Sequence, residues 1–404
     1  MKRYGIGVLA LTFSLGTALA ADQDLQSLQN QVTMGKTPTP AANPNAPLLI
    51  PPPPALKAKS YVVMDTLSGM VVAEKEMNTV VEPASLTKLM TLYLTFSALH
   101  SGQIHLNDQV PISAHAWKMD GSRMFVKVGS FVTVDELIRG ITVASGNDAT
   151  VALAEYIGGT EETFAQLMNQ TAQSLGMKNT HFMDSTGMPN DQHYTTAYDL
   201  ALLARALIEN FPQEYHYFSE KWITYNNIKQ PNRNRLLWQD PSVDGLKTGH
   251  TDSAGFCLIA SAKRNNMRLI SVIMNTPNES ERAIESEALL NYGFRFYTTK
   301  LVFNGMNQLV TPRVWKGAYK KASLGLANNM YVTVPVGTDQ QLKTVVQMMQ
   351  PLKAPLMKGQ TYGQVLVELN GKIVGQAPLV ALSENPQGGW LRQGFDSIAL
   401  LFKK

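Results

Sequence analysis

Three short motifs follow one another along the chain, and their side chains together can form and resolve an acyl ester. The first is Ser85-Leu86-Thr87-Lys88, the second is Ser145-Gly146-Asn147 and the third is Lys247-Thr248-Gly249. Each motif alone occurs by chance in many proteins, and a Ser-x-x-Lys at a helix start is usually a cap followed by a solvated lysine. The ordered set, with spacings of about 60 and about 100 residues, is much rarer. We therefore interpret the three motifs as parts of one site.

Ser85 is the predicted nucleophile, but a serine hydroxyl is a weak nucleophile at neutral pH and needs a nearby base. An apolar stretch predicts a helix from about Ser85 to His100, ended by Gly102, which places Lys88 on the same face as Ser85. A lysine accepts a proton only if desolvation or another cation lowers its pKa. Lys247 is the candidate for that cation.

The other two motifs are expected to complete the site. Ser145 and Asn147 would enter from a loop between two helices, where the serine can relay a proton and the asparagine can hold a substrate amide. The third motif is expected on an edge strand that pairs with an extended substrate, its lysine and threonine facing a carboxylate. The backbone N–H groups of Ser85 and His250 are the expected oxyanion donors. The predicted reaction is acylation of Ser85, loss of a leaving group, and hydrolysis.

A sheet and a cluster of helices must position these motifs. Two pairs of apolar runs around turn residues predict hairpins, at about residues 61–73 and 256–274. Strands at both sequence ends with helices between them predict an α+β fold, in which one antiparallel sheet has a helical cluster beside it. Apolar periodicity and capping residues predict helices at residues 134–144, 148–157, 161–175, 197–209 and 281–292.

The N-terminal residues predict export. Lys2 and Arg3 precede an apolar run that ends in a small-residue cleavage signal, so residues 1–20 are expected to be a signal peptide. A retained membrane helix is the alternative, but the run is short for a span of about 20 residues. Residues 21–57 are rich in proline and predict an extended tether.

The remaining chain is expected to form a catalytic domain at residues 58–297, a small β-rich domain at 298–386 and a C-terminal helix at 388–404. Asn370-Gly371 is a typical two-residue hairpin turn of the β-rich domain. The C-terminal helix is amphipathic and too short to span a bilayer. Its aromatic start and dilysine end favour the membrane interface over docking on the β-rich domain.

Composition restricts the classes of function. The 404 residues are 44% hydrophobic and 16% charged, which is typical of a globular protein. The net charge is +4 and the basic residues are scattered, so nothing indicates a nucleic-acid partner. Cys257 is the single cysteine and excludes an intrachain disulfide. The seven histidines lack metal-ligand spacing, so we expect neither a metal nor another cofactor.

The chain resembles the D-alanyl-D-alanine carboxypeptidases of the type-5 class C low-molecular-mass penicillin-binding proteins over about residues 58–404. Residues 83–88, 145–149, 232–234 and 244–252 carry the resemblance. It implies a serine DD-peptidase/β-lactamase-like domain that removes the terminal D-alanine from peptidoglycan stem pentapeptides, with β-lactams as slow acylating mimics. It also implies a role in cell wall biogenesis and cell shape, at the periplasmic face of the bacterial inner membrane, with the C-terminal helix on the membrane surface.

The resemblance implies roles for single residues. Ser85 would be the acyl-ester nucleophile, Lys88 the proton acceptor and Ser145 the second-motif serine. Gly121-Ser122-Arg123 is expected at the mouth of the site, with an arginine where a small or apolar residue is typical. The expected substrate contacts are Lys247, Asn147, Thr248, Gly249, His250, Ser122, Arg233 and Arg282.

Other functions remain open at this point. A class A β-lactamase would place a Glu-x-x-Leu-Asn element between the second and third motifs, whereas residues 287–291 follow the third motif in a predicted helix. The motifs do not define the leaving group, so a D,D-endopeptidase is an alternative. A slow penicillin-acylated scaffold is another, and a homodimer is left open.

Overall fold

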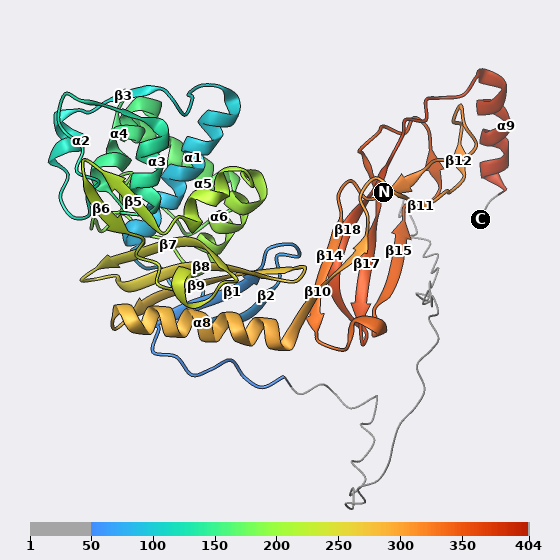
Figure 1. The fold of residues 1–404 in the computed structure, drawn as a ribbon. Coiled ribbons are helices and arrows are strands. Elements are labelled where there is room, and N and C mark those ends of the chain that lie inside the picture. The colour runs from blue at the N-terminus through green and yellow to red at the C-terminus, as the bar shows by residue number, and fades with distance from the viewer. Residues whose placement is uncertain (1–49, 403–404) are drawn as a thin grey trace, which may run out of the picture. The chain divides into compact units, whose positions relative to one another are not determined.

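The computed structural model describes residues 50–402, which divide into two units, Pro53–Thr299 and the residues from Lys300 onward (Figure 1). The predicted signal peptide and residues 21–49 of the predicted tether lie outside the described residues.

The first unit is built on a five-stranded antiparallel sheet with the strand order β2-β1-β9-β8-β7. The first predicted hairpin forms β1 and β2, and the second forms β8 and β9. Strand β1 pairs with β9, so the start and end of the unit meet in the sheet. The third motif lies on β7, at the sheet edge, as predicted. The strands are β1 (Ser60–Asp65), β2 (Val71–Lys75), β7 (Val243–Thr251), β8 (Gly255–Arg264) and β9 (Met267–Thr276).

Helices cover both faces of this sheet, which explains why its central strands are nearly continuous apolar runs. Helix α8 (Glu279–Phe296) runs along one face, and the other helices gather on the opposite face (Figure 1). Those helices are η1 (Ala84–Thr87), α1 (Lys88–Ser101), α2 (Ala114–Lys118), α3 (Val134–Thr142), α4 (Asn147–Gly158), α5 (Glu161–Ser174), α6 (Ala197–Asn210), η2 (Glu214–Ser219) and α7 (Leu236–Gln239). Two short hairpins complete the unit, β3 (Gln109–Pro111) with β4 (Phe131–Thr133) and β5 (Trp222–Tyr225) with β6 (Ile228–Pro231).

Side-chain caps begin several of these helices where the sequence predicts them. Thr160 accepts a hydrogen bond from the backbone N–H of Thr163, and Thr196 accepts one from Asp199. Two expectations need correction. Ser85 lies in the 3₁₀ turn η1, and the α-helix begins only at Lys88. Helix α8 extends beyond the predicted residues 281–292 at both ends, and its earlier start is explained by the Asn278 side chain, which accepts a hydrogen bond from the backbone N–H of Glu281.

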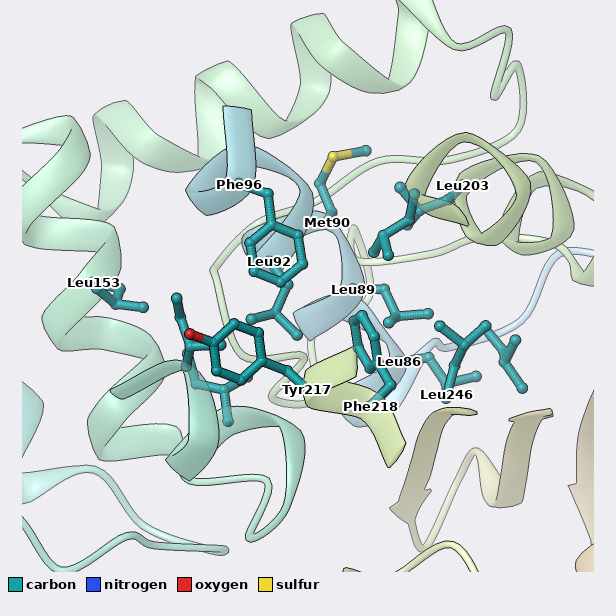
Figure 2. Packing of buried hydrophobic residues seen from close by; sticks show 14 of the residues in the cluster. Leu86, Leu89, Met90, Leu92, Phe96, Leu153, Leu203, Tyr217, Phe218 and Leu246 are labelled. Carbon is teal, nitrogen blue, oxygen red and sulfur yellow. The ribbon is translucent and has the colours of Figure 1, made fainter. Parts of the chain in front are cut away.

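The core joins the elements that carry the three motifs (Figure 2). Leu86, Leu89 and Phe96 from η1 and α1 are buried at its centre. They pack with Leu153 of α4, Leu203 of α6, Tyr217 and Phe218 of η2, and Leu246 of β7. Because these elements share one core, the packing that stabilises the domain also holds the motifs in register.

The second unit is β-rich and has a core of its own. Its main sheet has the order β11-β13-β18-β17-β15. Asn370 and Gly371 have φ of 51° and 77° and form the tight turn that the sequence predicts. Its elements are β10 (Tyr297–Phe303), β11 (Gln308–Val310), β12 (Val314–Trp315), β13 (Leu324–Gly325), β14 (Met330–Pro335), η3 (Asp339–Gln341), β15 (Lys343–Met348), β16 (Leu352–Lys353), β17 (Thr361–Leu369), β18 (Lys372–Ala381) and α9 (Trp390–Leu401).

Helix α9 packs on this unit through its polar side. Asp396 is buried, accepts a 2.6 Å hydrogen bond from the Lys316 backbone N–H and pairs with Arg313 at 3.1 Å. These two donors satisfy the Asp396 carboxylate, which explains why it can be buried. Six apolar side chains stay 56–84% exposed, namely Trp390, Leu391, Phe395, Ile398, Leu401 and Phe402.

Candidate active site

The turn that carries Ser85 has an uncommon backbone conformation. Ala84 has φ of 48°, in the left-handed region that residues with a side chain rarely adopt. Gly187, itself at φ +85°, lies against this turn, and a Cβ added there would overlap the carbonyl oxygen of Ala84. The turn around Ser85 therefore depends on a glycine about 100 residues away.

Lys88 is completely buried beneath Ser85. Its Nζ donates to Ser85 Oγ at 2.8 Å and to the Thr186 carbonyl oxygen at 2.7 Å. Its pKa is lowered from 10.5 to about 7, mainly because the amine is buried; the negative charge of Asp184 opposes this shift, and the positive charge of Arg233 contributes to it. From the sequence, we expected either desolvation or the positive charge of Lys247 to lower the pKa of Lys88. Desolvation dominates, and Arg233 is the neighbouring cation. A neutral amine at this distance can accept the serine proton.

Lys247 forms a second amine–hydroxyl pair. Its Nζ donates to Ser145 Oγ at 2.8 Å and to the Thr248 carbonyl oxygen at 3.0 Å. Burial lowers the pKa of Lys247 well below its usual value, and the positive charges of Lys88, Arg233 and Arg282 contribute. Ser145 lies between α3 and α4, as predicted, with a left-handed φ of 60°. The cavity thus presents two serines, each next to a buried lysine.

The second motif also holds the loop that carries Ser122. Asn147 donates from its backbone N–H to the Ser122 carbonyl at 2.7 Å and from Nδ2 to the Asp120 carbonyl at 2.5 Å. The buried Asp148 carboxylate accepts hydrogen bonds from the backbone N–H groups of residues 124, 125 and 126 at 2.8–3.1 Å. Our sequence analysis assigned no role to Asp148, although an acid in the first turn of a helix is a recognisable signal.

Gly249 brings β7 close to the Ser85 turn. A Cβ at Gly249 would lie 3.1 Å from the Pro83 carbonyl oxygen and 3.2 Å from the Leu86 Cγ, closer than side chains normally approach. The Gly249 carbonyl accepts a 3.5 Å hydrogen bond from Arg282, which also donates to Glu279 at 2.9 Å. This strand therefore presents its edge directly beside the nucleophile.

These elements enclose a cavity of about 520 Å³ that gathers residues from all three motifs. Lys88 and Lys247 lie beneath it, buried. Arg123 stands where a small or apolar residue is typical of the family. It does not line the cavity, and its side chain donates a hydrogen bond to the Trp117 carbonyl oxygen. The expected site residues on the cavity wall are Ser85, Ser122, Ser145, Asn147, Arg233, Thr248, Gly249, His250 and Arg282.

A loop that the sequence analysis missed supports Lys88 through the Thr186 carbonyl oxygen. The Asp184 carboxylate accepts hydrogen bonds from the backbone N–H groups of Thr186 and Gly187, both at 2.7 Å. Buried His193 lies 3.3 Å from Asp184 and 2.9 Å from Thr87 Oγ1, which ties this loop to the first motif. The Asp-x-Thr-Gly sequence is a turn signature that could have indicated the loop, but not its contact with Lys88.

Replacing Gly187 with alanine is expected to displace the Ser85 turn. The new Cβ would overlap the Ala84 carbonyl oxygen, and the positive φ disfavours any side chain. We expect the rate of penicillin acylation to fall at least about 100-fold, since small displacements of reacting groups have effects of that size. Stopped-flow acylation measures it. Gly129→Ala, at φ +72° in open space, is the matched control, and equal rates in both variants would contradict the prediction.

The fold and this cavity define a serine acyl-enzyme of the penicillin-binding and β-lactamase class. The family model of the D-alanyl-D-alanine carboxypeptidases matches residues 49–278, and that of the penicillin-binding protein 5 C-terminal domain matches residues 296–387. The chain belongs to the D-alanyl-D-alanine carboxypeptidase family. The expected family, enzyme class and α+β-then-β fold are thereby confirmed.

Individual relatives agree with this assignment. D-alanyl-D-alanine carboxypeptidase DacA of Escherichia coli K12 is 42% identical over 366 residues, covering 89% of this chain and 91% of the relative. DacC of the same strain is 41% identical, covering 86% and 89%. The crystal structure of penicillin binding protein 5 from Haemophilus influenzae has a TM-score of 0.80 and 40% identity, and covers 83% of this chain and 99% of that chain.

Proposed function

We propose that this carboxypeptidase removes the terminal D-alanine from peptidoglycan stem pentapeptides through an acyl ester on Ser85. The observation that carries the proposal is the buried Lys88 amine, 2.8 Å from the Ser85 hydroxyl at the floor of the cavity and with a pKa near 7. A base whose pKa is close to the working pH is the most efficient proton acceptor.

In the proposed first step, Ser85 Oγ attacks the carbonyl carbon of the terminal peptide bond while Lys88 accepts its proton. The backbone N–H groups of Ser85 and His250 would stabilise the oxyanion. Collapse of the tetrahedral intermediate breaks the C–N bond. The proton held by Lys88 is relayed through Ser145, which is hydrogen-bonded to Lys247, to the departing D-alanine amine, and Lys88 is neutral again. Water then attacks the ester and gives a proton to Lys88, and Lys88 returns that proton to Ser85 Oγ as the ester C–O bond breaks, which restores the Ser85 hydroxyl.

We assign recognition of the substrate carboxylate to Arg233 and Thr248 on the cavity wall. The side chain of Arg233 is exposed and makes no hydrogen bond or ion pair with the rest of residues 50–402. Arg282 is instead held by Glu279 and backbone carbonyls, so its role would be to orient β7 and add positive potential. β-Lactams would acylate the same serine and leave slowly.

Purified protein and a synthetic stem pentapeptide test the proposal. We expect one D-alanine per peptide, released over many turnovers, and labelling of the protein by penicillin. Labelling without D-alanine release would support the scaffold alternative instead. Preferential cleavage of a crosslinked peptide dimer, without release of terminal D-alanine, would support the endopeptidase.

For location, we propose export by residues 1–20 and attachment of α9 to the periplasmic face of the inner membrane. The exposed apolar side of α9 supports attachment at the interface. No helix within residues 50–402 is long and apolar enough to cross a bilayer. The proposed domain limits remain 58–297, 298–386 and 388–404.

Replacing Phe395 and Leu401 with serine is expected to weaken binding to lipid vesicles at least about 100-fold. These side chains are 73% and 80% exposed, and burying each in lipid contributes about 1.5–3 kcal/mol. Vesicle flotation measures the partition coefficient. The control is Met357→Ser with Ile373→Ser, two exposed apolar positions elsewhere in the same unit. An equal loss in both double variants would argue against α9 as the anchor.

A further inference from the structure

A second cavity, of about 580 Å³, is lined by α9 and by residues on both sides of β12. Both elements belong to the β-rich unit and are neighbours in Figure 1. Four cationic side chains and one carboxylate line the cavity, so its formal charge is +3. Its lining residues are Arg313, Lys320, Lys321, Leu391, Arg392, Phe395 and Asp396.

The positive charge of this cavity is only partly neutralised within the protein. Asp396 is paired with Arg313 at 3.1 Å, and Arg392 donates to the Ala318 carbonyl oxygen at 2.8 Å. Lys320 and Lys321 are exposed, and neither side chain has a hydrogen bond or ion pair with another of residues 50–402. The ammonium groups of these two consecutive lysines are therefore available to bind an anion from outside the described chain.

The cavity lining also includes two apolar side chains of α9. These are Leu391 and Phe395, and both belong to the exposed apolar side of α9. A ligand that fits must combine an anionic group with hydrocarbon. A free anion would leave Leu391 and Phe395 in water, and a neutral lipid would leave both lysines without a partner.

We propose that this cavity binds the headgroup of an anionic phospholipid, with the phosphate at Lys320 and Lys321 and the acyl chains along Leu391 and Phe395. The inference rests on the proposed attachment of α9 to the membrane. It adds a lipid-selective contact, made by the folded β-rich unit, to the attachment by the helix. The peptidase would then bind preferentially where anionic lipid is abundant.

The first test titrates the full chain with dihexanoyl phosphatidylglycerol below its critical micelle concentration and follows binding by calorimetry. We expect saturable binding of one lipid per chain. Each lysine near a lipid phosphate contributes about fivefold, so Lys320→Gln with Lys321→Gln is expected to weaken binding about 30-fold. The matched control, Lys343→Gln with Lys372→Gln, removes the same charge from exposed positions outside the cavity and should bind like the wild type.

The other ligands distinguish the sources of the anion. Dihexanoyl phosphatidylcholine and inorganic phosphate are expected to bind at least about tenfold more weakly, and equal binding of either would overturn the assignment. Equal affinity of both lysine double variants for phosphatidylglycerol would overturn it as well.

Vesicles separate this proposal from the proposed anchor. On vesicles with phosphatidylglycerol, Lys320→Gln with Lys321→Gln should weaken binding, whereas on phosphatidylcholine alone it should not. If vesicle binding is weakened by Phe395→Ser with Leu401→Ser but not by the Lys320 and Lys321 substitutions, the result supports α9 as the anchor and refutes the headgroup site. D-Alanine release from a soluble pentapeptide should be unchanged in every lysine variant, which keeps this test independent of the proposed reaction.

Discussion

Ser85→Ala is expected to abolish both D-alanine release and covalent labelling by penicillin. The substitution removes the Oγ that forms the acyl ester, and the Lys88 amine 2.8 Å away then has no hydroxyl to deprotonate. Removing the nucleophile of a serine hydrolase lowers kcat by on the order of 10⁶-fold. Alanine is smaller than serine and Ser85 lines an open cavity, so we expect the fold to be retained.

Two measurements check this result. Intact-protein mass spectrometry after incubation with penicillin should show no added mass, and D-alanine release should fall by on the order of 10⁶-fold. Ser101→Ala, the same substitution at the exposed end of α1, is the control and should keep both activities. A penicillin adduct that persists in Ser85→Ala would show that another residue is the nucleophile. Ser145 would then be the candidate, because it also contacts a buried lysine.

Lys88→Met has the second largest expected effect. Methionine fills a similar volume but cannot accept a proton, and general-base catalysis contributes about 10²–10⁴-fold. We therefore expect acylation by penicillin to slow by about that factor, as measured by stopped-flow. Lys127→Met, at an exposed position of the same unit, is the control and should leave the rate unchanged.

The pH dependence of the acylation rate is a second test of Lys88 as the general base. The base is the neutral form of Lys88, whose pKa is about 7. In the wild type, the acylation rate should fall tenfold per pH unit below pH 7 and level off above it. The step near pH 7 should be absent in Lys88→Met. If the variant kept that step, Lys247 would be the titrating amine instead.

The folded state should tolerate loss of the Lys88 charge. Between pH 7 and 10.5 the unfolded chain carries a proton on this amine that the folded chain lacks, so unfolding takes up a proton. Burial of the Lys88 amine therefore destabilises the folded state most below pH 7. This destabilisation decreases as the pH rises from 7 toward 10.5. Removing the amine eliminates that cost, although its two hydrogen bonds are lost as well.

Much of the site and fold could be predicted from the sequence because the relevant signals are local. The residue types of the three motifs define the chemistry, and their order identifies the family. Thr160 and Thr196 mark helix starts, since each hydroxyl caps a backbone N–H only three residues away. Asn370-Gly371 predicts its hairpin for the same reason, because few other residue pairs adopt two successive positive φ angles.

The distances and energies of the site were decided by the tertiary structure. The pKa of Lys88 depends on complete burial and on Arg233, which is 145 positions away in the sequence. The conformation of the Ser85 turn depends on Gly187, and the support of Lys88 depends on Asp184 and Thr186. The pKa of Lys88 and the conformation of the Ser85 turn depend on how distant segments pack, so they cannot be predicted from a local sequence pattern.

Helix α9 shows the same division within one element. Its periodicity predicts an amphipathic helix, because every side chain's direction follows from 3.6 residues per turn. Which side packs on the protein depends on partners outside the helix, namely Arg313 and the Lys316 N–H that bind Asp396. The sequence alone determines chemistry and local geometry here, whereas burial and electrostatics arise only when segments far apart in the chain meet.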